Sequence, residues 1–167
     1  EIGMNMNLFA YGKENEHKWI IVDTGVTFAD DSVPGIDIIY PDCGYLESKK
    51  DKIVGIVLTH AHEDHIGAIT YIWPKFKCNI YATPFTSVLI QEKFKEKKID
   101  ISGYLKIVKL NSTLNLDPFN IEFISLTHSI VEPNGLKIST PIGSVFHTGD
   151  WKCDPNPLVG EKINSNR

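Results

Sequence analysis

Short apolar runs rich in β-branched and aromatic residues recur along the chain, separated by polar segments that contain glycine and proline. Two such runs, residues 4–11 and 18–23, flank a polar stretch of five residues, which predicts a β-hairpin. Similar runs predict strands at residues 36–40, 53–59, 79–83, 105–110, 119–126, 136–139 and 143–147.

The run at residues 53–59 is almost continuously apolar, which is typical of a strand buried on both faces. Helical spacing predicts a helix at residues 84–98 and a shorter one at 66–73 that stops at Pro74. Residues 44–52 are predicted to form a polar helix or turn. This mixture of elements predicts an α/β protein in which helices pack against the sheet.

The composition is that of one globular domain, since 42% of the 167 residues are hydrophobic and 23% are charged. The formal net charge of −4 excludes a generally cationic surface for nucleic acid. No apolar run reaches the roughly 18 residues of a membrane span, so we expect no membrane association. Cys43, Cys78 and Cys153 are odd in number and widely spaced, which favours a reducing compartment and therefore the cytoplasm.

Three of the six histidines lie within residues 60–65, directly after the strand predicted at 53–59. An extended backbone would point His60 and His62 to the same side, where both imidazoles could bind one cation. Asp64 and His65 come after the bend and would face a second cation nearby. Burying these polar groups without a ligand would be costly, so a metal centre is favoured over a structural domain with fortuitous histidines.

His128 and Asp150 each follow a predicted strand, at residues 119–126 and 143–147. Taken singly, a histidine at a strand end or a Gly-Asp turn has an ordinary structural explanation. Together with residues 60–65 they complete the donor set of a metal site.

The segment Thr59-His60-Ala61-His62-Glu63-Asp64-His65, followed by His128 and Asp150, resembles the metallo-β-lactamase superfamily. Within it, the Glu-Ile-Gly of residues 1–3, Asp23-Thr24-Gly25, Pro34-Gly35, His128-Ser129 and residues 147–152 resemble the ribonuclease J group of β-CASP nucleases. The resemblance implies an incomplete αββα-sandwich fold of mixed sheets with flanking helices.

The same resemblance implies two divalent cations, with zinc expected and manganese or magnesium as alternatives. His60, His62 and His128 would bind one metal. Asp64 and His65 would bind the other, and Asp150 would bridge both, with Asp64 and Asp150 taking part in catalysis. Asp23 would either orient a ligand or cap a turn, and His147 is expected to belong to the core.

The implied activity is hydrolysis of RNA phosphodiesters, as endonuclease or 5′-exonuclease in RNA processing or decay, by a hydroxide that two metals activate. The family's seventh ligand, a histidine, and its β-CASP domain have no counterpart after Asp150. We therefore expect residues 1–167 to be the N-terminal portion of a metallo-β-lactamase domain, with weak or no activity alone. Exposed edges would favour a homo-oligomer or a complementary chain.

Two other functions remain open on the same scaffold. One is a small-molecule metallo-hydrolase, such as a thioesterase or lactonase. The other is a remnant that binds metal without catalysing a reaction. Cleavage of RNA compared with cleavage of a thioester, together with the metal content, separates the three.

Overall fold

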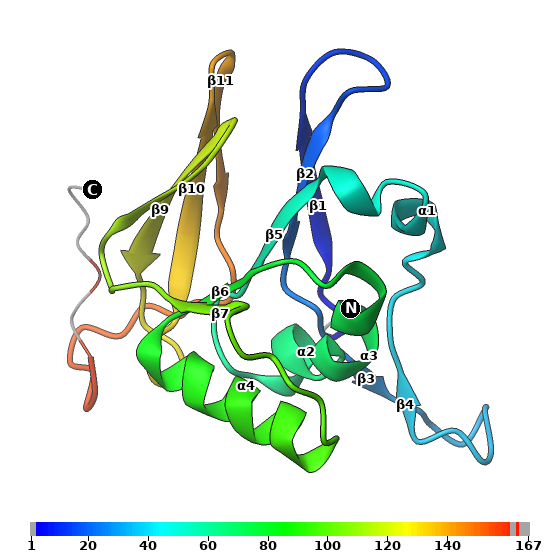
Figure 1. Ribbon diagram of the computed structural model, residues 1–167. Coiled ribbons are helices and arrows are strands. Elements are labelled where there is room, and N and C mark those ends of the chain that lie inside the picture. Colours follow the sequence, from blue (N-terminus) through cyan, green and yellow to red (C-terminus); the bar gives the residue numbers. More distant parts are fainter. Residues whose placement is uncertain (1–2, 161–162, 164–167) are drawn as a thin grey trace.

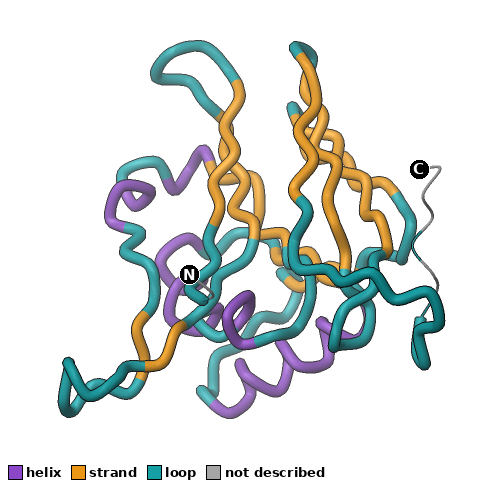
Figure 2. The backbone as a smooth tube through the Cα atoms, turned by 180° about the vertical axis from the view of Figure 1, so that it is seen from behind, coloured by secondary structure: helices purple, strands orange, loops and turns teal. Residues whose placement is uncertain are grey.

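Two β-sheets pack face to face in the computed structural model, which describes residues 3–160 and 163 (Figure 1). Residues 1–2 of the Glu-Ile-Gly motif lie outside the described residues. The helices lie beside and below the first sheet, and the view from behind shows the two sheets as separate sets of strands (Figure 2). On the far side of the second sheet neither view shows a helix within the described residues. The fold is thus an α/β sandwich that lacks one helical layer in this part of the chain.

The first sheet has five strands, and its order confirms the predicted hairpin. In spatial order the strands are β1 (Asn7–Tyr11), β2 (Lys18–Val22), β5 (Ile53–Val57), β6 (Ile80–Ala82) and β7 (Leu105–Ile107). β1 is antiparallel to β2, whereas β2, β5, β6 and β7 are mutually parallel. Parallel strands end at the same edge of a sheet, so the segments after β2 and β5 lie together.

The second sheet is antiparallel, in the order β11-β10-β9-β8. Its strands are β8 (Thr113–Leu116), β9 (Phe119–Ser125), β10 (Asn134–Thr140) and β11 (Gly143–His147). β8 was not predicted, although its side chains alternate between exposed and half-buried as in a half-covered strand. A short separate hairpin joins β3 (Thr27–Phe28) to β4 (Ile38–Ile39).

The helices predicted at residues 44–52 and 84–98 agree with the structure, whereas the one predicted at 66–73 begins later, at Ile69, and follows a short helix that was not predicted. The helices are α1 (Gly44–Glu47), the short 3-10 helix η1 (Lys50–Lys52), α2 (Glu63–Ile66), α3 (Ile69–Phe76) and α4 (Pro84–Glu96). The prediction that the helix stops at Pro74 was wrong, because α3 continues through it to Phe76. Pro74 lies in the last turn, and burial of Trp73 and Phe76 on both sides of it holds the helix together. The indole of Trp73 also donates a hydrogen bond to the Cys78 carbonyl at 2.7 Å.

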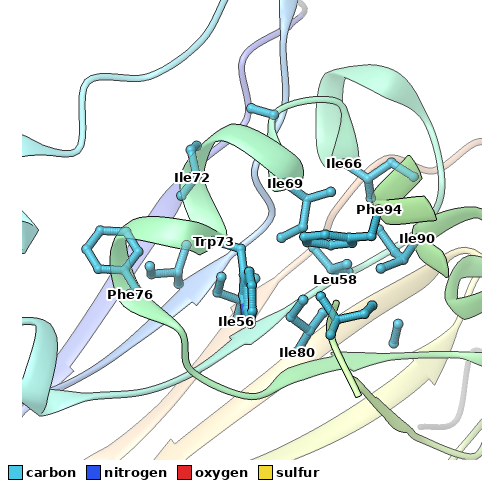
Figure 3. Packing of buried hydrophobic residues seen from close by; sticks show 14 of the residues in the cluster. Ile56, Leu58, Ile66, Ile69, Ile72, Trp73, Phe76, Ile80, Ile90 and Phe94 are labelled. Atoms are coloured by element: carbon cyan, nitrogen blue, oxygen red, sulfur yellow. The ribbon is translucent and has the colours of Figure 1, made fainter. Parts of the chain in front are cut away.

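β5 is buried on both faces, as its apolar run predicts, but only one of the two faces packs against helices. Ile56 and the following Leu58 pack against residues of α3 and α4 (Figure 3). Val57 belongs to a second cluster, between the sheets, with Phe123 and Leu136. The side chains of these five residues are fully buried. The end of β5 is therefore fixed from both sides, which makes it a rigid base for the segment that follows.

The described residues contain no helix long and apolar enough to cross a membrane. Cys43, Cys78 and Cys153 are all free thiols, as their spacing in the sequence suggested.

Candidate metal centre

The segment of residues 60–65 follows the end of β5 and ends inside α2. The backbone stays extended through His62, whose φ and ψ are −72° and 151°, and then turns into α2 at Glu63. This confirms the extended conformation expected at His62. The parallel pairing of Val22 with Val57 brings Asp23, the residue after β2, beside the same edge.

Three histidines from two distant segments converge here. One ring nitrogen from each of His60, His62 and His128 lies within 4.8 Å of the other two. His60 Nε2 is 3.1 Å from His62 Nδ1, and the His128 ring centroid is 5.2 Å from that of His60. The three predicted ligands of the first cation are therefore gathered at one point, and their ligation of a metal stays a prediction.

A second group of donors lies next to the first and consists of His60, His65 and Asp150. Asp64, which the resemblance assigns to the second cation, is not part of this group, but its Oδ2 lies 3.4 Å from His65 Nε2. The second group contains His60 in place of Asp64, so His60 is a member of both groups. All six residues predicted from the sequence thus lie at one site, with Asp64 at its edge.

The carboxylate of Asp150 belongs to the second group and also faces His128 of the first group. Its Oδ1 is 3.5 Å from His65 Nε2, and its Oδ2 is 3.7 Å from His128 Nε2. The two oxygens of one carboxylate thus face one histidine of each group. This arrangement is compatible with the bridging role that the resemblance implies.

Hydrogen bonds between two loops position His128 and Asp150. The backbone N–H of Lys152 donates to the Thr127 carbonyl at 2.8 Å, and the Thr127 hydroxyl donates to the Lys152 carbonyl at 2.5 Å. Gly149, at φ 55°, brings the loop so close that an added Cβ would lie 2.9 Å from the Asn134 carbonyl oxygen. The loop after β9 and the loop after β11 are therefore joined to each other beside the site.

Asp23 contacts a predicted ligand, as expected for a residue that orients one. The carboxylate is fully buried, and its Oδ2 lies 2.8 Å from His65 Nδ1. Its Oδ1 accepts the backbone N–H of Thr59 at 2.8 Å, and its Oδ2 accepts the Thr59 hydroxyl at 2.8 Å. Asp23 thus both orients His65 and fixes the end of β5.

Asn5 is a residue of this site that the sequence did not indicate. Its side-chain Nδ2 lies 3.1 Å from His65 Nε2 and 3.3 Å from Asp64 Oδ2. Asn5 lies two positions before β1 and is not part of a recognisable metal-binding motif. Asp64 and His65 lie 59 and 60 positions after Asn5 in the sequence, so only the fold reveals these contacts.

His147, expected to belong to the core, is half-buried at the end of β11 and is not among the buried residues of the two core clusters. Its ring lies edge-to-face on Phe9, with centroids 6.0 Å apart. Burial lowers its pKa. Its Nε2 is buried without a hydrogen-bond partner among the described residues.

The protonation of the histidines suits cation binding. Burial, with the nearby rings of His65, His62 and His128, lowers the pKa of His60 to about 2, so this imidazole is neutral. Burial also lowers the pKa of His128. For His65, burial lowers the pKa, but the hydrogen bond and charge of Asp23, with the charges of Asp64 and Asp150, raise it more. Imidazoles that face one another beside carboxylates are the donors that a divalent cation requires, so the residues fit a metal.

Two hollows flank the site. One, of about 400 Å³, opens beside His128 and is also lined by Thr127, Glu132 and Val159. A larger apolar hollow, of about 710 Å³, is lined in part by Phe146 and holds none of the six predicted ligands. Of these two hollows, the first is therefore the one that reaches a predicted ligand, His128.

Comparison with known proteins gives a consistent family and fold. The sequence profile of the metallo-beta-lactamase superfamily matches residues 9–152. A protein named ribonuclease J from Sinorhizobium meliloti is 40% identical over 169 residues, which cover 100% of this chain and 30% of that protein. Ribonuclease J from Helicobacter pylori is 41% identical over 159 residues, covering 95% of this chain and 22% of that protein. The chain spans less than a third of the length of these curated relatives.

Solved structures resemble the fold at low sequence identity. A protein of unknown function from Enterococcus faecalis superposes with a TM-score of 0.62 at 17% identity, covering 91% of this chain and 41% of that chain. The metallo-beta-lactamase fold protein YhfI from Bacillus subtilis gives 0.56 at 18% identity, with coverages of 89% and 56%. These likenesses concern the fold alone.

Proposed function

Because the chain belongs to the metallo-β-lactamase superfamily, we propose that it carries the metal-binding residues of a hydrolase that cleaves RNA phosphodiester bonds. One observation supports this above all others. The ring nitrogens of His60, His62 and His128 lie within 4.8 Å of one another, although His60 and His62 follow a strand of the first sheet and His128 follows a strand of the second. Such convergence of imidazoles has no structural purpose that an apolar core would not serve better.

In this proposal His60, His62 and His128 hold one cation, and Asp64, His65 and Asp150 hold the second. Asp150 is shared, since its two oxygens face His65 and His128. Zinc is the expected metal, and oxygen-rich ligation of the second position would also suit manganese or magnesium.

Bound divalent cations would supply an activated water nucleophile and would neutralise charge that develops on the phosphoryl oxygens. The protein's own residues hold this apparatus in place. Asp23 fixes the His65 ring through its contact with Nδ1. The other ring nitrogen, Nε2, then faces the carboxylates of Asp64 and Asp150. The Asp150 carboxylate, 38% exposed, is open on one side and could accept a hydrogen bond from an attacking water.

RNA is proposed as the substrate because several relatives that match nearly the whole chain at about 40% identity are named ribonuclease J. A small-molecule metallo-hydrolase and a metal-binding protein without catalysis are the alternatives. The domain assignment, the cytoplasmic location and pairing with a second copy or a complementary chain stay predictions. We also propose that turnover by this chain alone is weak or absent.

Metal-dependent binding of RNA tests the proposal even when turnover is weak. A fluorescent RNA with non-hydrolysable phosphorothioate linkages is titrated with the protein, with zinc or manganese and with chelator. We expect binding that requires metal and that is lost in His60→Ala, whereas Lys106→Ala on β7 retains it.

Single-turnover assays with excess protein then compare RNA with a thioester. Slow cleavage of RNA that leaves 5′-phosphate ends supports the nuclease, and metal-dependent cleavage of the thioester alone contradicts it. Metal binding without either RNA binding or cleavage would favour the non-catalytic alternative.

A further inference from the structure

The segment before β1 runs along the metal-site loop. The backbone N–H of Asn5 donates to the Asp64 carbonyl at 2.9 Å, and the Gly25 N–H donates to the Asn5 carbonyl at 2.8 Å. Met4 N–H similarly donates to the Val26 carbonyl at 3.1 Å. The Asn5 backbone is therefore fixed between the loop after β2 and the beginning of α2.

The Asn5 side chain points from this fixed backbone to two predicted ligands. Its Nδ2 lies 3.1 Å from the Asp64 carbonyl oxygen, 3.3 Å from Asp64 Oδ2 and 3.1 Å from His65 Nε2. Asp23 occupies His65 Nδ1, so a bound cation would take Nε2, and the Asn5 amide would then keep its two contacts with Asp64. A side-chain amide has two N–H donors, which match the carbonyl oxygen and the carboxylate Oδ2 of Asp64.

These contacts concern only one half of the site. Within the described residues, the hydrogen bonds of the Asn5 side chain go to Asp64 and His65 and to none of His60, His62 and His128. Asp23 holds His65 from the other side of the ring, at Nδ1. The Asp64 carboxylate is 23% exposed and would otherwise be free to change rotamer.

We propose that Asn5 is a positioning residue that sets the Asp64 carboxylate for the second cation. This inference rests on the proposed function, because it assumes that the six donors bind two metals. Removing partners of metal ligands weakens metal binding by about 10–100-fold. Loss of the Asn5 amide should therefore weaken the second cation selectively and leave the first unchanged.

Metal titration of the full chain tests this without any activity measurement. Zinc and manganese binding to Asn5→Ala is measured by calorimetry and by metal analysis after equilibrium dialysis. We expect the first cation to bind as in the wild type and the second to bind at least about 10-fold more weakly. Manganese spectra should lose the magnetic coupling between paired ions at metal concentrations that fill both positions in the wild type.

Asn120→Ala is the matched control, since Asn120 also donates from Nδ2 to a side chain, Asn115 Oδ1, but on an exposed hairpin. It should bind both cations normally. Asn5→Ser keeps a shorter donor and serves as a second variant if Asn5→Ala does not fold. It should show a smaller loss, again confined to the second cation.

Two results would overturn the inference. One is wild-type affinity for both cations in Asn5→Ala, and the other is equal weakening of both, which would indicate a general structural role. Failure of the wild type to bind a pair of cations is a different result, because it would contradict the proposed function itself.

Discussion

The Oδ2 of Asp23 lies 2.8 Å from Nδ1 of His65, although 42 residues separate them. Both side chains are buried, with 0% and 2% of their surface exposed. The contact depends on the parallel pairing of β2 with β5, which brings residue 23 to the edge where residues 60–65 begin. It links the geometry of the sheet directly to the orientation of one predicted ligand.

Asp23→Asn should weaken binding of the second cation by about 10-fold or more, since the amide cannot supply the negative charge that Asp23 places on His65 Nδ1. Asparagine tolerates the left-handed backbone of this position, at φ 64°, so folding should be retained. Calorimetric zinc titration measures the effect, and circular dichroism checks the fold. Unchanged affinity for both cations would show that Asp23 serves only as a cap of Thr59.

Gly25→Ala should unfold or strongly destabilise the protein. An added Cβ would lie 1.6 Å from the Asp64 carbonyl oxygen and 2.8 Å from the Asn5 nitrogen, and backbone atoms cannot yield as a flexible side chain would. We expect a loss of more than about 3 kcal/mol in the free energy of unfolding, measured by urea denaturation.

Gly103→Ala provides the matched control for this substitution. Gly103 has open space around its Cβ position, and only its φ of 81° opposes alanine, which should cost about 1–2 kcal/mol. Equal effects of the two substitutions would contradict the close approach of the two loops at Gly25.

Glu63→Gln should leave metal binding intact, although Glu63 lies among the predicted ligands in the sequence. Both carboxylate oxygens of Glu63 contact Lys93 Nζ, at 2.6 and 2.7 Å, and tie α2 to α4. This pair is partly exposed, so its loss should lower the free energy of unfolding by at most about 1 kcal/mol. A double-mutant cycle with Lys93→Ala measures the coupling. Loss of a bound cation in Glu63→Gln would mean that the carboxylate reaches the site after all.

Cys78 should resist alkylation at neutral pH. Burial raises the pKa of its thiol from 9.0 to about 12, so the reactive thiolate forms only as the pH approaches that value. Cys153 is exposed and should react first. Iodoacetamide labelling at pH 8, read by peptide mass spectrometry, checks the order. Labelling of Cys78 at a rate similar to that of Cys153 at this pH would contradict its burial.

Local patterns in the sequence predicted the parts of the fold that depend on short-range order. The apolar run around Ile56 predicted a strand buried on both faces, and the hairpin of β1 and β2 followed from two such runs. The pattern could not show that a second sheet rather than helices covers one face of β5, because apolar neighbours of either kind favour the same residues. The end of α3 was misplaced because the burial of Phe76 outweighs the local effect of Pro74.

The candidate site was predictable where a motif carried it. Residues 60–65 lie within one segment, and His128 and Asp150 follow recognisable strands, so the sequence indicated six residues that the fold brings together; their binding of metal stays a prediction. Asn5 was missed because its role depends on a contact across 59 residues, for which a lone asparagine gives no signal. The sequence also could not predict that His60 belongs to both groups of donors, because only the fold shows which ring nitrogens and carboxylate oxygens lie close together.

The central claim is that His60, His62 and His128 share one cation. Anomalous diffraction at the zinc edge, from crystals grown with zinc and without chelator, tests it most directly. The account predicts a strong peak about 2.0–2.1 Å from one nitrogen of each of the three rings, with a second peak beside Asp64, His65 and Asp150. No peak among the three histidines, at full zinc occupancy elsewhere in the crystal, would contradict it.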